Sequence, residues 1–150
     1  MAARTAPASR LIVAEPPAAY RVQSPLVVDA SVIGALLFGE PERDQAEAWM
    51  KGKQLFAPAL LDYEIANVAV KKLRDGLDLA SAEIALRSYD SADIELLHAD
   101  ATALVGLAKR YQLSAYDAAY LWLAAELKAP LATFDRRLGE AAQAYLATLD

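Results

Sequence analysis

The chain has 150 residues, a net charge of −5 and no cysteine, which excludes disulfides, thiolate zinc sites and cysteine nucleophiles. Its 56% hydrophobic residues are enough to fill the core of one domain, and no apolar run reaches the roughly 18 residues of a membrane span. The negative charge alone argues against a nucleic-acid ligand, because phosphate backbones attract Lys and Arg. Bound divalent cations would remove that objection.

Residues 1–24 differ in composition from the rest of the chain. They hold three of the seven prolines and carry three Arg against one Glu. The Pro16–Pro17 pair prevents a regular helix or a central strand there. We interpret residues 1–24 as a partly disordered N-terminal extension and residues 25–150 as one folded domain. The first residues include no apolar stretch typical of a signal peptide, so we expect a cytoplasmic protein.

From residue 25 onward, short apolar strands alternate with helical stretches. The sequence predicts strands at 26–29, at 54–58, within 93–99 and at 131–134. It predicts helices at 31–38, 41–51, 58–73, 79–89, 99–111, 115–128 and 136–146. This order favours an α/β sandwich, in which a short parallel sheet of about four or five strands is covered by helices.

Two of the predicted strands end on an acidic residue. LVVD ends at Asp29, and LATFD ends at Asp135. In open parallel sheets, ligand sites form beyond the carboxyl ends of the strands. Asp29 is the stronger candidate, because Asp135 can also be read as an ordinary helix N-cap.

Two further acids lie in helices that are otherwise apolar. Glu64 lies in ALLDYEIANVAVKKL, and Asp117 lies in SAYDAAYLWLAAEL. A carboxylate among Leu and Val is partly desolvated unless a cation pairs with it. The alternatives are a salt bridge from Glu64 to Lys71 or Lys72, and a capping role for Asp117.

Several carboxylates close together point to a divalent metal ion. Mg²⁺ and Mn²⁺ prefer oxygen ligands, and clustered carboxylates repel one another unless a cation neutralises them. Two such ions roughly 3.5–4 Å apart can stabilise both the attacking water and the leaving oxygen of a phosphodiester. His98 is the only histidine, which excludes a His-rich site, and we interpret it as structural.

Three segments in this order resemble the PIN-domain ribonucleases, and most closely the toxins called VapC. They are DASVIGALLFGEPE, YEIANVAVKK and LSAYDAAYLWLAAELKAPLATFD. The resemblance covers about residues 26–145 and implies a PIN-like fold. It also implies an endoribonuclease that hydrolyses RNA by metal-activated water, the toxin of a type II toxin–antitoxin pair. Such toxins form homodimers and are inhibited by a cognate antitoxin protein.

The resemblance also assigns roles to individual residues. It implies that four acids bind Mg²⁺ or Mn²⁺ and carry out catalysis: Asp29, Glu64, Asp117 and Asp135. It implies supporting roles for Ser31, Asn67 and Thr133. Four aromatic residues are instead interpreted as packing or interface residues: Trp49, Trp122, Tyr116 and Tyr120.

Three other functions are compatible with parts of this pattern. A phosphoryl-transfer or receiver-type domain also places an Asp at a strand end, although such a site needs a second early acid, and Asp29 is followed by Ala30 and Ser31. A catalytically silent binding module is the second alternative, and a nuclease acting on DNA is the third. The presence of all four acids argues against the silent module.

Overall fold

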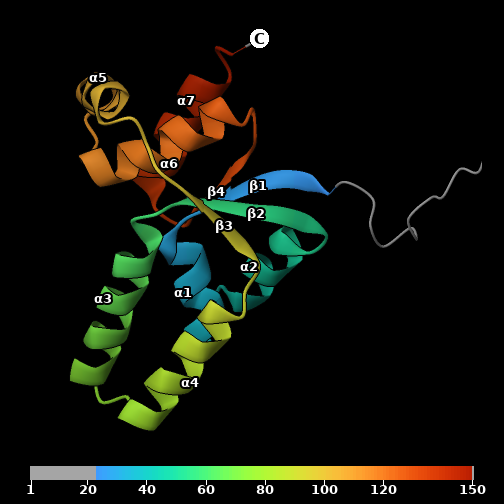
Figure 1. The fold of residues 1–150 in the computed structure, drawn as a ribbon, viewed down its shortest axis with the longest axis vertical. Coiled ribbons are helices and arrows are strands. Elements are labelled where there is room, and N and C mark those ends of the chain that lie inside the picture. The colour runs from blue at the N-terminus through green and yellow to red at the C-terminus, as the bar shows by residue number, and fades with distance from the viewer. Residues whose placement is uncertain (1–22, 150) are drawn as a thin grey trace, which may run out of the picture.

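The computed structural model describes residues 23–149 (Figure 1). The predicted extension, residues 1–24, lies outside this range except for its last two residues. Within the described range the strands are β1 (Ser24–Val28), β2 (Lys53–Pro58), β3 (Ile94–Leu97) and β4 (Leu131–Ala132). The helices are α1 (Ala30–Phe38), α2 (Arg43–Met50), α3 (Leu61–Arg74), α4 (Leu79–Asp90), α5 (Ala101–Tyr111), α6 (Ala115–Glu126) and α7 (Arg136–Leu146).

The four strands form one parallel sheet in the order β3-β2-β1-β4. The chain passes from β1 outward to β2 and β3, and then returns to place β4 on the other side of β1. The strand order therefore reverses between β1 and β4. In open parallel sheets this switch point is where ligands bind.

Helices cover both faces of the sheet (Figure 1). The helices α1 to α4 connect the first three strands and lie on one face, whereas α5, α6 and α7 lie on the other. This arrangement, together with the parallel sheet, confirms the predicted α/β sandwich. None of the helices in the described range is long and apolar enough to cross a membrane.

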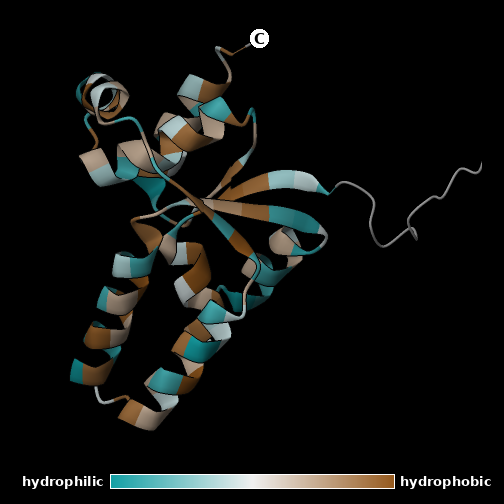
Figure 2. Cartoon of the chain, in the orientation of Figure 1, coloured by the Kyte–Doolittle hydropathy of each residue, from teal (hydrophilic) through white to brown (hydrophobic). Residues whose placement is uncertain are grey.

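The strands become buried toward their carboxyl ends. Leu26, Val27 and Val28 are fully buried in β1. In β2, too, the last three residues are buried, whereas the first three are partly or fully exposed. Figure 2 shows the corresponding change from polar to apolar residues along these two strands. The carboxyl ends of the strands are therefore held rigidly by the core, which fixes the backbone of any side chain placed there.

Several predicted boundaries differ from the observed ones. Pro58 was expected to open a helix, but it is the last residue of β2, and α3 begins only at Leu61. The final position of a strand tolerates Pro, because its missing N–H leaves a single ladder bond unmade. The predicted strand at 131–134 is shortened to two residues. Thr133 and Phe134 instead donate hydrogen bonds to the side chains of Asp29 and Ser31.

Candidate active site

The four predicted acids line one pocket of about 290 Å³ at the switch point of the sheet. Asp29 follows β1, Glu64 lies on α3, Asp117 lies on α6, and Asp135 follows β4 and begins α7. Residues far apart in the sequence are thus brought together, and two predicted supporting residues, Ser31 and Asn67, line the same pocket.

Asp29 is the most deeply placed of these acids, with 5% of its surface exposed. It is the N-cap of α1, and its Oδ1 accepts hydrogen bonds from the Val32 backbone N–H (3.1 Å) and the Ser31 hydroxyl (2.6 Å). Its Oδ2 accepts a third from the Thr133 hydroxyl (2.5 Å). These donors fix the carboxylate in one orientation.

Thr133 and Ser31 also join the loop after β4 to the start of α1. The Phe134 backbone N–H donates to the Ser31 hydroxyl (2.9 Å), and the Asp135 backbone N–H donates to the Thr133 hydroxyl (2.9 Å). The two predicted supporting hydroxyls therefore orient Asp29 and the segment that carries Asp135. Thr133 itself does not line the acid pocket.

Glu64 is half-buried on α3, and its Oε2 accepts a hydrogen bond from the Tyr120 hydroxyl (2.6 Å). The alternative of a salt bridge to Lys71 or Lys72 is wrong: within residues 23–149 Glu64 forms no salt bridge, and the Lys72 ammonium pairs with Glu40 at 2.6 Å. No Lys or Arg is among the described residues that line the pocket. Glu64 therefore faces other carboxylates without a basic neighbour in the pocket wall.

Asp117 and Asp135 both lie at helix N-termini. Ser114 is the N-cap of α6, and its hydroxyl donates to Asp117 Oδ2 at 2.9 Å, so Asp117 lies in the first turn and is not the cap. Asp135 is the N-cap of α7 and accepts from the Leu138 backbone N–H at 2.9 Å. The capping alternative for Asp135 is therefore correct, and the same side chain also lines the pocket.

The environment of the pocket makes the ionised forms of Asp29 and Glu64 less favourable than in water. Burial raises the pKa of Asp29 above its usual 3.8, against the lowering effect of its hydrogen bonds. Burial also raises the pKa of Glu64 above its usual 4.5, and repulsion from Asp29 and Asp117 adds to this effect, against the lowering effect of the Tyr120 hydrogen bond. The metal-free site is thus under electrostatic stress that a cation would relieve.

These raised pKa values predict a pH-dependent stability. In EDTA, we expect the free energy of unfolding to fall as the pH rises through a window that each acid defines. For each acid the window begins at its usual pKa, 3.8 for Asp29 and 4.5 for Glu64, and ends at its raised pKa in the native state. In that window the native state binds more protons than the unfolded chain. Urea unfolding at a series of pH values checks this, with the double variant Asp29→Asn, Glu64→Gln as the comparison. Identical pH dependence of the two proteins would refute the prediction.

The donor chemistry of the pocket fits a hard divalent ion, although the side chains do not converge on one point. Four carboxylates, the Asn67 amide and the Ser31 hydroxyl supply only oxygen and amide groups, which suit Mg²⁺ or Mn²⁺. Within residues 23–149, no group of three or more Asp, Glu, His or Cys side chains is close enough to hold a metal ion as it stands. Each of the four carboxylates accepts a hydrogen bond instead.

Tyr120, interpreted from the sequence as a packing or interface residue, also lines the pocket and contacts one of its acids. Its side chain is 1% exposed, yet its hydroxyl reaches Glu64 across 56 positions of sequence. Burial raises the pKa of Tyr120, and the hydrogen bond to Glu64 raises it further. The hydroxyl therefore stays protonated and acts as the donor in this hydrogen bond. A sequence signal existed, because Ser114, Asp117 and Tyr120 are spaced by three and share one face of α6.

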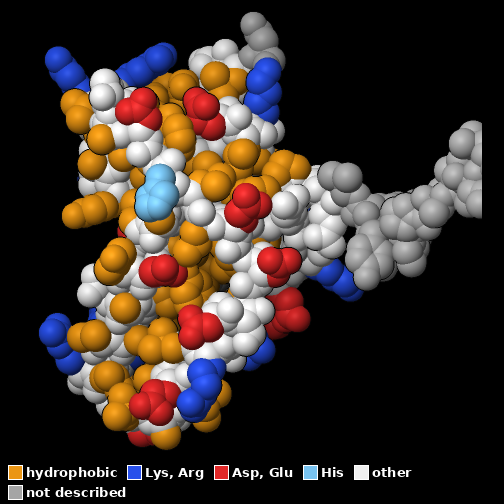
Figure 3. Space-filling view, viewed as in Figure 1, with side chains coloured by type: hydrophobic (Ala, Val, Ile, Leu, Met, Phe, Trp, Pro, Cys, Tyr) orange, Lys and Arg blue, Asp and Glu red, His pale blue; other side chains and the backbone are white. Residues whose placement is uncertain are grey.

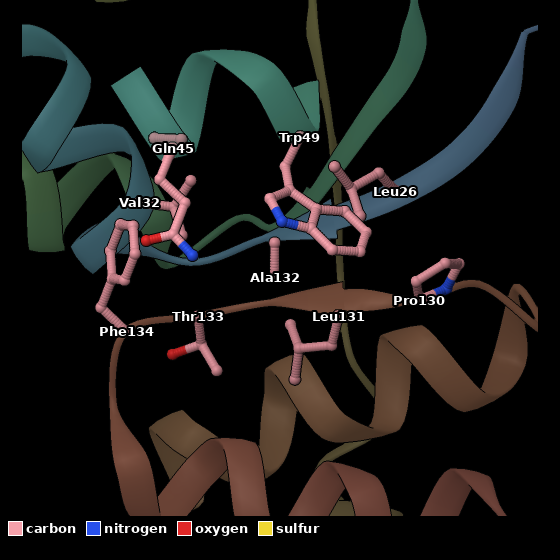
Figure 4. Close-up of a pocket in the computed structure, with 10 residues that line it drawn as sticks. Leu26, Val32, Gln45, Trp49, Pro130, Leu131, Ala132, Thr133 and Phe134 are labelled. Carbon is pink, nitrogen blue, oxygen red and sulfur yellow. The ribbon is translucent and has the colours of Figure 1, made fainter. Parts of the chain in front are cut away.

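A second cavity, of about 270 Å³, lies between α2 and β4 (Figure 4). Its wall is mainly apolar and contains none of the four acids. Ala132 points toward Trp49, whereas Leu131 and Thr133 point to the opposite side of β4. Trp49 is 57% exposed, so its ring packs on the cavity wall and also meets solvent. Chemistry that needs carboxylates therefore belongs to the other pocket.

The chain matches the PIN domain over residues 26–144. It belongs to the PIN-domain family. Ribonuclease VapC3 of Pyrobaculum aerophilum is 38% identical over 127 residues, which cover 77% of this chain and 92% of the relative. Ribonuclease VapC9 of Mycobacterium tuberculosis is 36% identical over 126 residues, which cover 79% of this chain and 92% of the relative. The match to the PIN domain spans the three segments on which the resemblance rests.

Solved structures share the PIN-domain fold. The crystal structure of PAE2754 from Pyrobaculum aerophilum has a TM-score of 0.66 and 26% identity, and the alignment covers 83% of this chain and 93% of that one. VapC20 of Mycobacterium tuberculosis, a Sarcin-Ricin loop cleaving toxin, has a TM-score of 0.57 and 16% identity, with coverage of 77% and 94%. At that identity the likeness to VapC20 concerns the fold alone.

Proposed function

We propose that this PIN-domain protein is a metal-dependent endoribonuclease, the toxin of a type II toxin–antitoxin pair. One observation carries the proposal: four carboxylates from separate elements line one pocket at the switch point of the sheet. The relatives named as ribonucleases supply the substrate class, RNA. We propose Asp29, Glu64, Asp117 and Asp135 as the residues that hold Mg²⁺ or Mn²⁺, with support from Ser31, Asn67 and Thr133.

The reaction would be hydrolysis of a phosphodiester bond. The oxygen of a water molecule bonds to phosphorus, one P–O ester bond breaks, and the leaving oxygen takes up a proton. A divalent ion, when bound, supplies the positive charge that activates the water and neutralises the phosphate. The chain itself orients the donors: Ser31 and Thr133 hold Asp29, and Tyr120 holds Glu64.

Exposed apolar residues on α3 and α4 support the proposed protein partners, an antitoxin and a second copy of the chain. Four large apolar residues on α3 and α4 are between 43% and 78% exposed: Tyr63, Val70, Leu79 and Ile84. Figure 3 shows one face of α3 and α4, on which apolar side chains lie among charged ones. Exposed apolar side chains of this kind suit protein contacts. We further propose that the protein acts in the cytoplasm.

The phosphoryl-transfer alternative fits Asp29 less well. Such a site needs a second acid close to the first and a Lys in the pocket. Asp29 is followed by Ala30 and Ser31, and no Lys is among the described residues that line the pocket. A silent binding module is also disfavoured, because it would gather several negative charges in one pocket without a bound cation to neutralise them.

A cleavage assay with the purified full-length protein, free of any antitoxin, tests the proposed function. We expect single-stranded RNA to be cut in Mg²⁺ or Mn²⁺ and to remain intact in EDTA. DNA of the same sequence should be cut much more slowly. Equal cutting of RNA in EDTA would overturn the metal dependence, and faster cutting of the DNA would favour the DNA nuclease.

A further inference from the structure

Tyr120 is placed to control the orientation of Glu64. It lies on α6, one helical turn after Asp117, and its hydroxyl donates to Glu64 Oε2 on α3 at 2.6 Å. Tyr120 also lines the acid pocket. Its ring is fixed, because the residue is only 1% exposed and packs in the core. A rigid donor of this kind determines where the flexible Glu side chain points.

We propose that Tyr120 is a positioning residue, whose hydroxyl donates to one oxygen of Glu64 and would leave the other available to bind the metal ion. This inference rests on the proposed function. Glu has three rotatable side-chain bonds, so an unheld carboxylate would lose more conformational entropy when an ion binds. Residues that orient metal ligands typically change metal affinity or activity about 10–100-fold when they are removed.

The chain offers a matched control for the same kind of bond. The Tyr89 hydroxyl donates to Asp62 at 2.7 Å, again between a neighbouring helix and α3. Neither Tyr89 nor Asp62 lines the acid pocket. Tyr89→Phe therefore removes a tyrosine–carboxylate hydrogen bond without touching the proposed metal ligands. Tyr116→Phe is a second control, because this tyrosine lies on α6 but is 68% exposed.

Titration calorimetry with Mn²⁺ alone tests the proposal on the full chain. We expect the Kd for Mn²⁺ to rise about 10–100-fold in Tyr120→Phe and to stay unchanged in both control variants. Cleavage by Tyr120→Phe should recover toward the wild-type rate at high Mn²⁺, because the defect lies in binding. Should Tyr120→Phe fail to fold, Tyr120→Met also lacks the hydroxyl and has a side chain that adapts to irregular spaces.

The outcomes separate this inference from the proposed function. If the wild-type protein binds Mn²⁺ and folded Tyr120→Phe binds it with the same Kd, the positioning role is overturned. The nuclease proposal would then still stand. An equal loss of affinity in Tyr89→Phe would also overturn the positioning role, because a general structural effect would explain both variants. Absence of Mn²⁺ binding to the wild-type protein would overturn the proposed metal site itself.

Discussion

Replacing Asp29 with Asn is expected to reduce RNA cleavage by about 10²–10³-fold or more, comparable to the loss of one main electrostatic group in other active sites. The fold should persist, because the Asn side chain can still accept from the Val32 N–H and the Ser31 hydroxyl and can donate to the Thr133 hydroxyl. Initial rates of RNA cleavage at saturating Mn²⁺, with thermal melts of both proteins in EDTA, measure the two effects.

Asp78→Asn is the matched control for this variant. Asp78 is also an Asp at a helix N-cap and also accepts from a backbone N–H and a Ser hydroxyl, but it caps α4 and does not line the acid pocket. Its substitution should leave the cleavage rate unchanged. Full activity of Asp29→Asn, or equal losses in both variants, would contradict the role proposed for Asp29.

Adding Mn²⁺ is expected to raise the melting temperature of the wild-type protein. An ion that binds only the native state at 100 times its Kd adds about 2.7 kcal/mol of stability, which corresponds to roughly 5–10 °C for a chain of this size. Removal of one charge in Asp117→Asn should stabilise the metal-free protein by up to about 1–2 kcal/mol, because repulsion within the pocket falls. The same variant should respond much less to Mn²⁺.

Thermal melts with EDTA or Mn²⁺ distinguish this account from a purely structural role of the acids. Asp93→Asn, an exposed acid outside the pocket, should behave like the wild type in both conditions. If the four acids were only caps and salt bridges, each substitution would destabilise the protein by about 0.5–2 kcal/mol, and Mn²⁺ would shift none of the melting temperatures.

The alternation of apolar strands and helices was enough to predict the fold class. LVV is fully buried and LFA is buried in its last two residues. Gly39 ends α1 with φ of 62°, a conformation that favours Gly. The start of the helix after the second strand was misplaced, because Pro58 suits the first position of a helix as well as the last position of a strand. Only the tertiary context selects between these two positions.

The candidate acids could be selected from the sequence because of their positions relative to the predicted strands and helices. Asp29 and Asp135 follow strands, whereas Glu64 and Asp117 interrupt apolar helices. Residues that act through other side chains are harder to find. Tyr120 suits a buried core on composition alone, and its bond to Glu64 depends on how α6 packs beside α3, which the spacing along either helix does not specify.

Anomalous diffraction at the manganese absorption edge, on crystals of the full chain grown with Mn²⁺, would show whether the four acids bind a metal ion. We expect a peak in the pocket between β1, α3, α6 and α7, with carboxylate oxygens of Asp29 and at least one other of the four acids at about 2.0–2.2 Å from the ion. A peak that is absent at millimolar Mn²⁺, or that lies only outside this pocket, would contradict the assignment of these acids as a metal-dependent nuclease site.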